Sequence, residues 1–110
     1  MDVTLALEVL SALSHETRLW VFRLLIQAGP EGLSAGEIAE SLCTRQNTMS
    51  SHLRILTAAG LIGNRREGRS IIYCANYDAV GQLVLFLMED CCAGNPAVCS
   101  PVAAALAAHA

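Results

Sequence analysis

The chain has 110 residues and a formal net charge of −3; 54% of its residues are hydrophobic but only 5% are aromatic. This length suits one domain with a single core, and the longest strongly apolar run, Leu83 to Met88, falls far short of the roughly 20 residues that a membrane span needs. We therefore expect neither a second core nor a membrane anchor, and the apolar composition favours packed helices that a dimer would help to bury.

Two further expectations follow from the composition. No secretory signal is visible at the N-terminus, so we expect a cytoplasmic protein. Its five cysteines are an odd number. In a reducing compartment they are interpreted as free thiols or ligands before disulfides.

Charge is distributed unevenly along the chain. Five arginines and one acid give residues 45–69 a charge of +4, whereas two arginines and nine acids give the remainder −7. A basic strip on an acidic protein attracts an anionic polymer to one surface. The alternative is a solvated arginine face that pairs with acids elsewhere, and charge alone does not decide between them.

Helical periodicity governs the first part of the chain. One set of apolar residues predicts a helix over 3–13: Val3, Leu7, Leu10 and Leu13. A second set predicts a helix over 15–28, after Ser14: Leu19, Phe22, Leu25 and Ile26. Gly29-Pro30 ends the second helix.

Two more helices follow, separated by a tight turn. Ser34 and Glu37 have the spacing of a capping box, so a third helix is expected from Ser34 to near Leu42. Thr44 is expected to cap a fourth helix, which ends at Gly60. A turn of only two or three residues between them is the connection of a helix-turn-helix.

The pattern changes after the fourth helix. Residues 61–66 and 69–74 are extended segments joined at Glu67-Gly68, and they predict one hairpin. Residues 78–92 return to helix and are apolar nearly all round, as expected of a buried or subunit-bridging helix. The alanine-rich residues 100–110 are expected to be a flexible tail.

The fourth helix separates apolar from polar side chains. At about 100° per residue, Met49, Leu53 and Leu56 share one side. The opposite side carries amides, hydroxyls and an arginine: Gln46, Asn47, Ser50, Ser51 and Arg54. Such groups hydrogen-bond to base edges and phosphates, whereas a plain solvent face more usually carries Glu and Lys. This face is therefore predicted to bind DNA.

Other residues near this helix receive separate interpretations. Three arginines flank the hairpin tip, where they can reach phosphate or an adjacent minor groove: Arg65, Arg66 and Arg69. His52 lies nearer the apolar side and is interpreted as a packed structural histidine. Cys43 and Cys74 are interpreted as small buried hydrophobic residues, because free cysteine is commonly buried.

Three motifs resemble those of the ArsR/SmtB family of winged-helix repressors. They are residues 13–18 (LSHETR), 46–62 (QNTMSSHLRILTAAGLI) and 65–73 (RREGRSIIY). The resemblance covers about positions 5 to 92. It implies a winged helix-turn-helix, mainly α with a β-hairpin wing (α+β). It also implies a homodimer through the first and last helices, operator DNA as a partner, and release from DNA when an inducer binds.

A cluster of thiols follows the last predicted helix: Cys91, Cys92 and Cys99. Thiolates select soft metals and metalloids, and three of them satisfy the pyramidal coordination of trivalent arsenic. Many arsenic-responsive members of the family carry a cysteine motif at the start of the third helix, but residues 33–38 here contain no thiol. The cluster instead resembles that of arsenite-responsive repressors whose three ligands lie at the C-terminal end.

Other inducers remain open. Tetrahedral zinc or cadmium needs a fourth ligand, and the nearby candidates Glu89, Asp90 and His109 are not convincingly spaced. A redox switch through a Cys92–Cys99 disulfide is also chemically feasible. We expect a winged helix-turn-helix and dimerisation domain over 1–92 and a thiol site over 91–99 that takes arsenite or antimonite.

An enzyme is not expected. A thiol enzyme such as an arsenate reductase needs an activated cysteine in a phosphate-like loop. The sequence has no glycine-rich anion loop and no Ser/Cys-His-acid arrangement. Passive metal storage would leave most of the chain without a role, so the sequence favours a transcriptional repressor.

Overall fold

The computed structural model describes residues 1–89, 101, 104–105 and 108. Its helices are α1 (Val3–Leu13), α2 (Glu16–Ala28), α3 (Ala35–Ser41), α4 (Gln46–Ala58) and α5 (Tyr77–Glu89), with a 3₁₀ turn η1 (Gly29–Glu31) after α2. The strands β1 (Leu33–Ser34), β2 (Ile62–Glu67) and β3 (Ser70–Ala75) form an antiparallel sheet in the order β1-β3-β2. This is the predicted mainly α fold with a β-hairpin wing.

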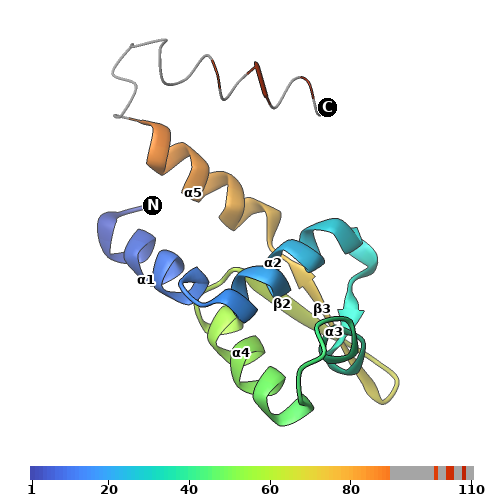
Figure 1. Cartoon of the computed structure of the whole chain (residues 1–110). Helices are drawn as coiled ribbons and strands as arrows, with labels where there is room; N and C mark the ends of the chain where they lie inside the picture. The colour runs from blue at the N-terminus through green and yellow to red at the C-terminus, as the bar shows by residue number, and fades with distance from the viewer. Residues whose placement is uncertain (90–100, 102–103, 106–107, 109–110) are drawn as a thin grey trace.

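Helices α1, α2, α3 and α4 and the sheet share one hydrophobic core. Figure 1 shows α1 and α5 towards one end of the fold, and α3, α4 and the β2-β3 hairpin towards the other. The largest fully buried side chains come from these helices and from the residue before β2: Val9, Val21, Leu25, Ile38, Met49, Leu53, Leu56 and Leu61. Complete burial of one such side chain stabilises the fold by about 1.5–3 kcal/mol. The predicted apolar side of the fourth helix is thus confirmed.

The helix-turn-helix begins at the predicted capping box. The Glu37 N–H donates to Ser34 Oγ at 3.2 Å, and the Ser34 N–H donates to Glu37 Oε1 at 3.0 Å. The turn after α3 is a Schellman motif, in which the Thr44 N–H donates to the Ala39 carbonyl at 2.9 Å and the Cys43 N–H to that of Glu40 at 3.2 Å. This motif sets the angle between α3 and α4.

Two interpretations of this turn are wrong. The Thr44 hydroxyl does not cap α4, because it donates to the Leu42 carbonyl at 3.1 Å and the N-cap residue is Arg45, without a side-chain cap bond. Cys43 is exposed, because the turn places it in the left-handed region with φ of 51°. Cys74 is half-buried.

The hairpin lies one residue later than predicted. Its pairs run from Ile62 opposite Ala75 to Glu67 opposite Ser70, which leaves Gly68 and Arg69 as a two-residue turn. Gly68 has φ of 62°, as a tight hairpin turn requires. Strand β1, paired with β3, was not predicted because two residues are too few to show periodicity.

Asn76 connects three elements. Its N–H donates to the Leu61 carbonyl at 2.9 Å, and its Nδ2 donates to the Gly60 carbonyl at 2.9 Å. Its Oδ1 accepts from the Ala79 N–H in the first turn of α5 at 3.3 Å. The residue directly after β3 is therefore hydrogen-bonded both to the segment that follows α4 and to the first turn of α5.

The apolar stripe predicted on α1 lies on the surface. Ala6, Val9 and Ala12 are buried instead, and three members of the predicted stripe are exposed: Val3, Leu7 and Leu10. In α2, similarly, Leu19 is exposed and Val21 is buried. In α1 the face towards the core thus consists of smaller residues than the exposed stripe.

Helix α5 is not buried within one chain. Leu83 is buried, but Val84, Leu85 and Leu87 are exposed, and Leu85 is 71% exposed. The sequence predicted either a buried helix or a subunit-bridging helix. Burial of this helix within the single chain is therefore wrong, while a subunit-bridging helix remains a prediction. None of the helices in the described part of the chain is long and apolar enough to cross a bilayer.

Candidate nucleic-acid interface

The polar face of α4 is exposed along its whole length. The structure brings together on it all five residues predicted from the sequence: Gln46, Asn47, Ser50, Ser51 and Arg54. The opposite face is buried in the core through Met49, Leu53 and Leu56. A helix that presents amides, hydroxyls and a guanidinium while its other face is fixed can enter a major groove as a rigid element.

Two of these side chains already make bonds within α4. The Ser50 hydroxyl donates to the Gln46 carbonyl at 2.9 Å, and Asn47 Oδ1 accepts from the Thr48 N–H at 2.9 Å. Ser50 thus presents oxygen lone pairs, and Asn47 presents its amide hydrogens. These bonds orient the two side chains before any ligand arrives.

The start of α4 adds residues that the sequence interpretation left out. Arg45 and Thr48 are exposed at this end of the helix. A helix N-terminus favours phosphate because its free N–H groups carry partial positive charge, and an adjacent arginine strengthens this effect. The basic strip over 45–69 was the available signal for Arg45.

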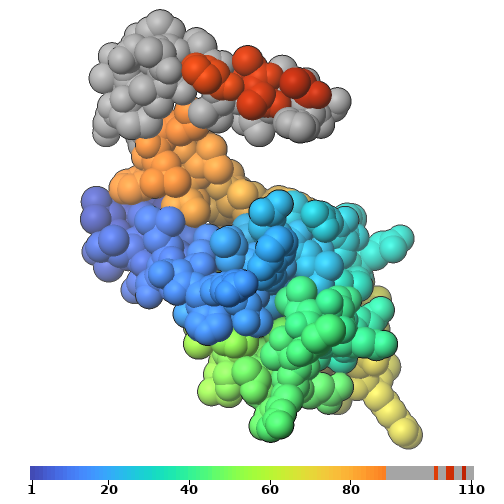
Figure 2. All heavy atoms as spheres, in the orientation of Figure 1, coloured from blue at the N-terminus to red at the C-terminus, as the bar shows by residue number. Residues whose placement is uncertain are grey.

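The hairpin extends the basic surface. Arg66 and Arg69 are exposed near its tip. Figure 2 shows this tip projecting from the body of the molecule, at the end where α3 and α4 also lie. Both guanidinium groups are therefore placed where they can contact a phosphate backbone beside α4, which we call the reading helix.

Arg65, by contrast, bonds within the protein. Its Nη1 donates to the Pro30 carbonyl and to Cys74 Sγ, each at 3.1 Å, and its Nη2 donates to the Glu31 carbonyl at 2.8 Å. Its Nε lies 3.2 Å from Glu67 Oε1, and this hydrogen bond raises the pKa of Arg65. Arg65 thus fastens β2 to η1, and the structure assigns it a role that the sequence did not indicate.

The predicted thiol site lies outside the described residues. Cys91, Cys92 and Cys99 are therefore still a prediction. Within the residues that the structure describes, no three His, Cys, Asp or Glu side chains gather closely enough to hold a metal ion.

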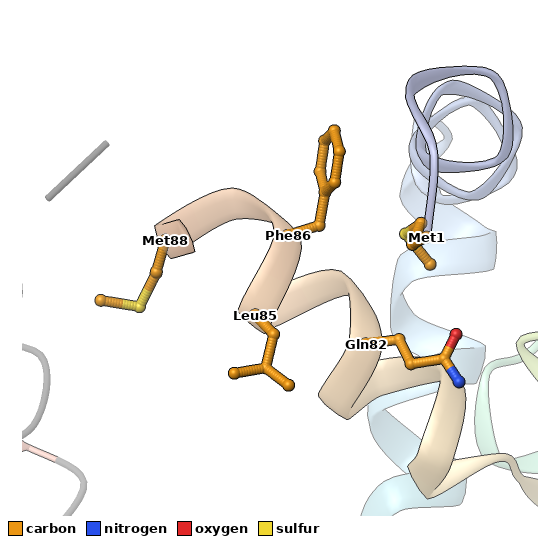
Figure 3. A pocket seen from close by; sticks show the side chains of 5 residues that line it. All are labelled: Met1, Gln82, Leu85, Phe86 and Met88. Carbon is orange, nitrogen blue, oxygen red and sulfur yellow. The ribbon is translucent and has the colours of Figure 1, made fainter. Parts of the chain in front are cut away.

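An apolar hollow adjoins α5 at the other end of the fold. It has a volume of 410 Å³ and is lined by Met1, Gln82, Leu85, Phe86 and Met88. Figure 3 shows Met1 on the side of α5 that carries Gln82 and Phe86, whereas Leu85 and Met88 project from α5 away from Met1. This hollow continues the exposed apolar residues of α1 and α5.

Comparison with known proteins agrees with this arrangement. Residues 13–62 match a family described as a helix-turn-helix domain. The chain is 33% identical over 96 residues to the uncharacterized HTH-type transcriptional regulator YbzH of Bacillus subtilis, and the match covers 76% of this chain and 96% of YbzH.

Solved structures with the same fold include other regulators. An ArsR-like transcriptional regulator from Rhodococcus sp. RHA1 has a TM-score of 0.73 and 26% identity, with 88% of this chain and 89% of that one covered. A homodimeric winged helix-turn-helix DNA-binding domain from Mycobacterium bovis, described as a possible ArsR-family regulator, has a TM-score of 0.66 and 26% identity, with 82% of each chain covered.

A further structure is described as a possible transcriptional regulator for arsenical resistance. It has a TM-score of 0.64 and 26% identity, and the match covers 74% of this chain and 81% of that one. The exposed reading helix, the wing and these relatives together show that the chain belongs to the ArsR/SmtB family of winged helix-turn-helix, DNA-binding transcriptional regulators.

Proposed function

We propose that the protein is a homodimeric transcriptional repressor that leaves its operator when trivalent arsenic or antimony binds Cys91, Cys92 and Cys99. The observation that carries the DNA-binding part is the exposed polar face of α4, opposite a face that is buried in the core. In this proposal the five predicted residues of α4 contact bases and phosphates. Arg66 and Arg69 contact the flanking backbone.

The dimer in this proposal forms through α1 and α5. Their exposed apolar residues and the hollow beside Met1 give each copy a surface that a second copy can cover. A two-fold axis would place two reading helices about one DNA turn apart, at roughly 34–36 Å. The homodimeric relative from Mycobacterium bovis supports this arrangement.

The inducer part depends on the chemistry of the donor set. Three thiolates within nine residues suit an ion that takes three soft ligands, and no fourth ligand is required. The similarity to a possible regulator for arsenical resistance supports a metalloid as the inducer. When bound, the ion would supply three bonds to sulfur directly after α5, and the Gly94 and Pro96 positions would let the chain bend around them.

The connection to DNA binding runs through α5. A change in the angle of α5 would move Asn76, which is hydrogen-bonded to Gly60 and Leu61 directly after α4. The two reading helices of a dimer would then no longer match two half-sites. Converting a mostly bound population into a mostly free one requires the ion to favour the released form by roughly 5 kcal/mol.

The test is a titration of reduced protein on a fluorescent duplex taken from the DNA upstream of its own gene. We expect salt-dependent binding that arsenite reverses. The variant with Cys91, Cys92 and Cys99 all changed to Ser should bind the duplex but ignore arsenite. The matched control changes Cys43 and Cys74 to Ser and should keep the response.

Two results would contradict the inducer assignment. One is release of the triple variant by arsenite as readily as of the wild type. The other is release by zinc, cadmium or an oxidant but not by arsenite, which would favour the alternatives that the sequence left open. Absence of duplex binding in every form would contradict the repressor proposal itself.

A further inference from the structure

A titratable side chain of the reading helix faces the interior. His52 is only 9% exposed, although its neighbour Ser51 lies on the DNA-facing surface. Its ring lies 4.6 Å from the ring of His15, measured between centroids, and its Nδ1 lies 3.5 Å from Nη1 of Arg18. The interpretation of His52 as a packed histidine is confirmed, but its polar contacts suggest more than packing.

Arg18 contacts two helices at once. Its Nε donates at 2.6 Å to the Ala12 carbonyl, near the end of α1, while its Nη1 faces His52 of α4. The guanidinium group is planar and presents its donors in fixed directions. The Arg18 side chain of α2 therefore contacts both the end of α1, a helix of the proposed dimer interface, and the reading helix.

This contact differs in kind from the rest of the α4 packing. Met49, Leu53 and Leu56 hold α4 through apolar contacts, which are not directional. A hydrogen bond is directional and weakens steeply with misalignment. The Arg18–His52 contact therefore restrains the rotation of α4 about its own axis, and this rotation decides which side chains face DNA.

The contact requires a neutral His52. Arginine only donates, so His52 Nδ1 must carry a lone pair. Burial lowers the pKa of His52 below its ordinary value of 6.5, and the charges of His15 and Arg18 lower it further. Glu8 of α1 lines the same 430 Å³ hollow as Arg18 and supplies a carboxylate to this junction. A protonated His52 would face Arg18 as a second cation.

We propose that Arg18 is a positioning residue for DNA recognition and that neutral His52 is its partner on the reading helix. The pair holds α4 in the rotation that reads DNA and connects that rotation to α1. Protonation of His52, or loss of the guanidinium group, releases this restraint while the apolar core keeps the chain folded. The inference depends on the proposed DNA-binding function.

The first experiment is a pH profile of DNA affinity. Fluorescence anisotropy with the upstream duplex runs from about pH 8 to about pH 5.5, the range in which histidine titrates, at a temperature where circular dichroism shows each protein folded. Wild-type affinity should decrease progressively towards the acid end of this range, because the pKa of His52 lies below 6.5 and a proton on its ring disfavours the bound form. His52→Asn offers an oxygen acceptor in place of Nδ1 but does not titrate, so its profile should be flat.

His15 needs its own control, because its Nδ1 accepts from the Thr17 N–H at 3.1 Å and caps α2. Asparagine is a good N-cap residue, so His15→Asn should keep the cap. This variant should show the wild-type decrease in affinity at low pH. A flat profile for His15→Asn together with a steep one for His52→Asn would overturn the inference.

The second experiment tests Arg18 directly. Arg18→Lys keeps the charge but lacks the planar group, and it should bind the duplex about tenfold more weakly at about pH 8, the loss expected for one hydrogen bond with a charged partner. The control is Arg23→Lys on the exposed side of α2, where the guanidinium lies 5.4 Å from the Trp20 ring, and it should bind normally. Normal binding by Arg18→Lys would overturn the proposal.

The outcomes also separate this inference from the proposed function. If the wild type fails to bind the duplex at about pH 8, the repressor proposal fails. If the wild type binds but His52→Asn has the same pH profile, only the inference fails. A purely structural role would lower the melting temperature in step with affinity, whereas a positioning role changes the pH profile at equal stability.

Discussion

Cys43 and Gly60 occupy the same position in two successive helix ends. Each follows the C-cap residue of its helix in a Schellman motif, and each has a positive φ, of 51° for Cys43 and 80° for Gly60. Glycine adopts this conformation freely, whereas a residue with a Cβ is strained by about 1–2 kcal/mol. The helix-turn-helix therefore contains a strained, exposed cysteine where the next helix uses glycine.

Changing Cys43 to Gly should stabilise the protein. Relief of the left-handed strain exceeds the extra entropy that glycine has in the unfolded chain, so we expect the free energy of unfolding to rise by about 0.5–1 kcal/mol. Urea denaturation at one fixed protein concentration measures this change. Gly60→Ala is the reciprocal control and should lower stability by a similar net amount, about 0.5–1 kcal/mol; a destabilised Cys43→Gly variant would contradict the explanation.

Gly29 and Gly32 should respond very differently to alanine. Both have positive φ, but a Cβ at Gly29 meets nothing within 4 Å, whereas a Cβ at Gly32 would lie 2.4 Å from the Tyr73 carbonyl oxygen. The backbone strain is shared, so the difference between the variants reports the clash with β3. Gly32→Ala should be less stable than Gly29→Ala by about 1–3 kcal/mol, as for an overpacked site. Equal denaturation midpoints would show that β1 is not held against β3 as described.

Arg66 and Arg65 should differ in their contribution to DNA binding. Arg66→Ala should weaken binding to all duplex sequences and reduce the slope of log affinity against log salt by about 0.9, the effect of one lost phosphate contact. Arg65→Ala should leave that slope unchanged, because the Arg65 donors bond to Pro30, Glu31 and Glu67. Anisotropy titrations at several salt concentrations measure both slopes; a reduced slope for Arg65→Ala alone would reverse the assignment.

The exposed leucines of α5 and α2 should differ in their effect on assembly. Leu85→Glu places a charge in the proposed dimer interface and should convert the dimer to a monomer at micromolar concentration. Burying an unpaired charge costs several kcal/mol. Leu19→Glu on α2, where Leu19 is 44% exposed, should leave the dimer intact. Sedimentation velocity distinguishes the two species, and a dimeric Leu85→Glu variant would place the interface elsewhere.

The capping box of α3 should make stability depend on pH. The hydrogen bond from the Ser34 backbone lowers the pKa of Glu37 below its ordinary value of 4.5. A lowered carboxyl pKa stabilises the folded state above pH 4.5, and this contribution is lost as pH falls through the folded-state pKa. Glu37→Gln keeps an oxygen acceptor but does not titrate. It should therefore melt below the wild type at neutral pH and approach it in acid; a constant difference in melting temperature would contradict this assignment.

Much of the fold could be predicted because local signals agree with the tertiary structure. The Ser34–Glu37 capping box and the helix end at Gly60 depend on chemistry within a few residues, and both are confirmed. The prediction of which side of α4 is buried is confirmed, because only one face of this helix is apolar. These signals also place all five predicted residues of α4 on one exposed surface.

The errors arise where tertiary contacts decide. Periodicity identified α1 but not which face is buried, because Ala6, Val9 and Ala12 face the core and the larger leucines lie outside. Arg65 has the same sequence signal as Arg66, and its bonds to η1 could not be foreseen because only the fold brings η1 within its reach, while its contact with DNA stays a prediction. Thr44 has a suitable residue type for a helix cap, but the Schellman turn directs its hydroxyl to Leu42.

The attachment of the wing has a consequence for recognition. A two-stranded hairpin alone is only marginally stable in water. Here β1 adds a third strand, and Arg65 fixes β2 to η1, so the hairpin is ordered when the chain folds. The surface proposed to bind DNA is therefore preorganised, and little binding affinity is lost in immobilising the hairpin. In the proposed dimer, affinity then depends on the orientation and spacing of the two DNA-binding surfaces, and not on any ordering of the wing.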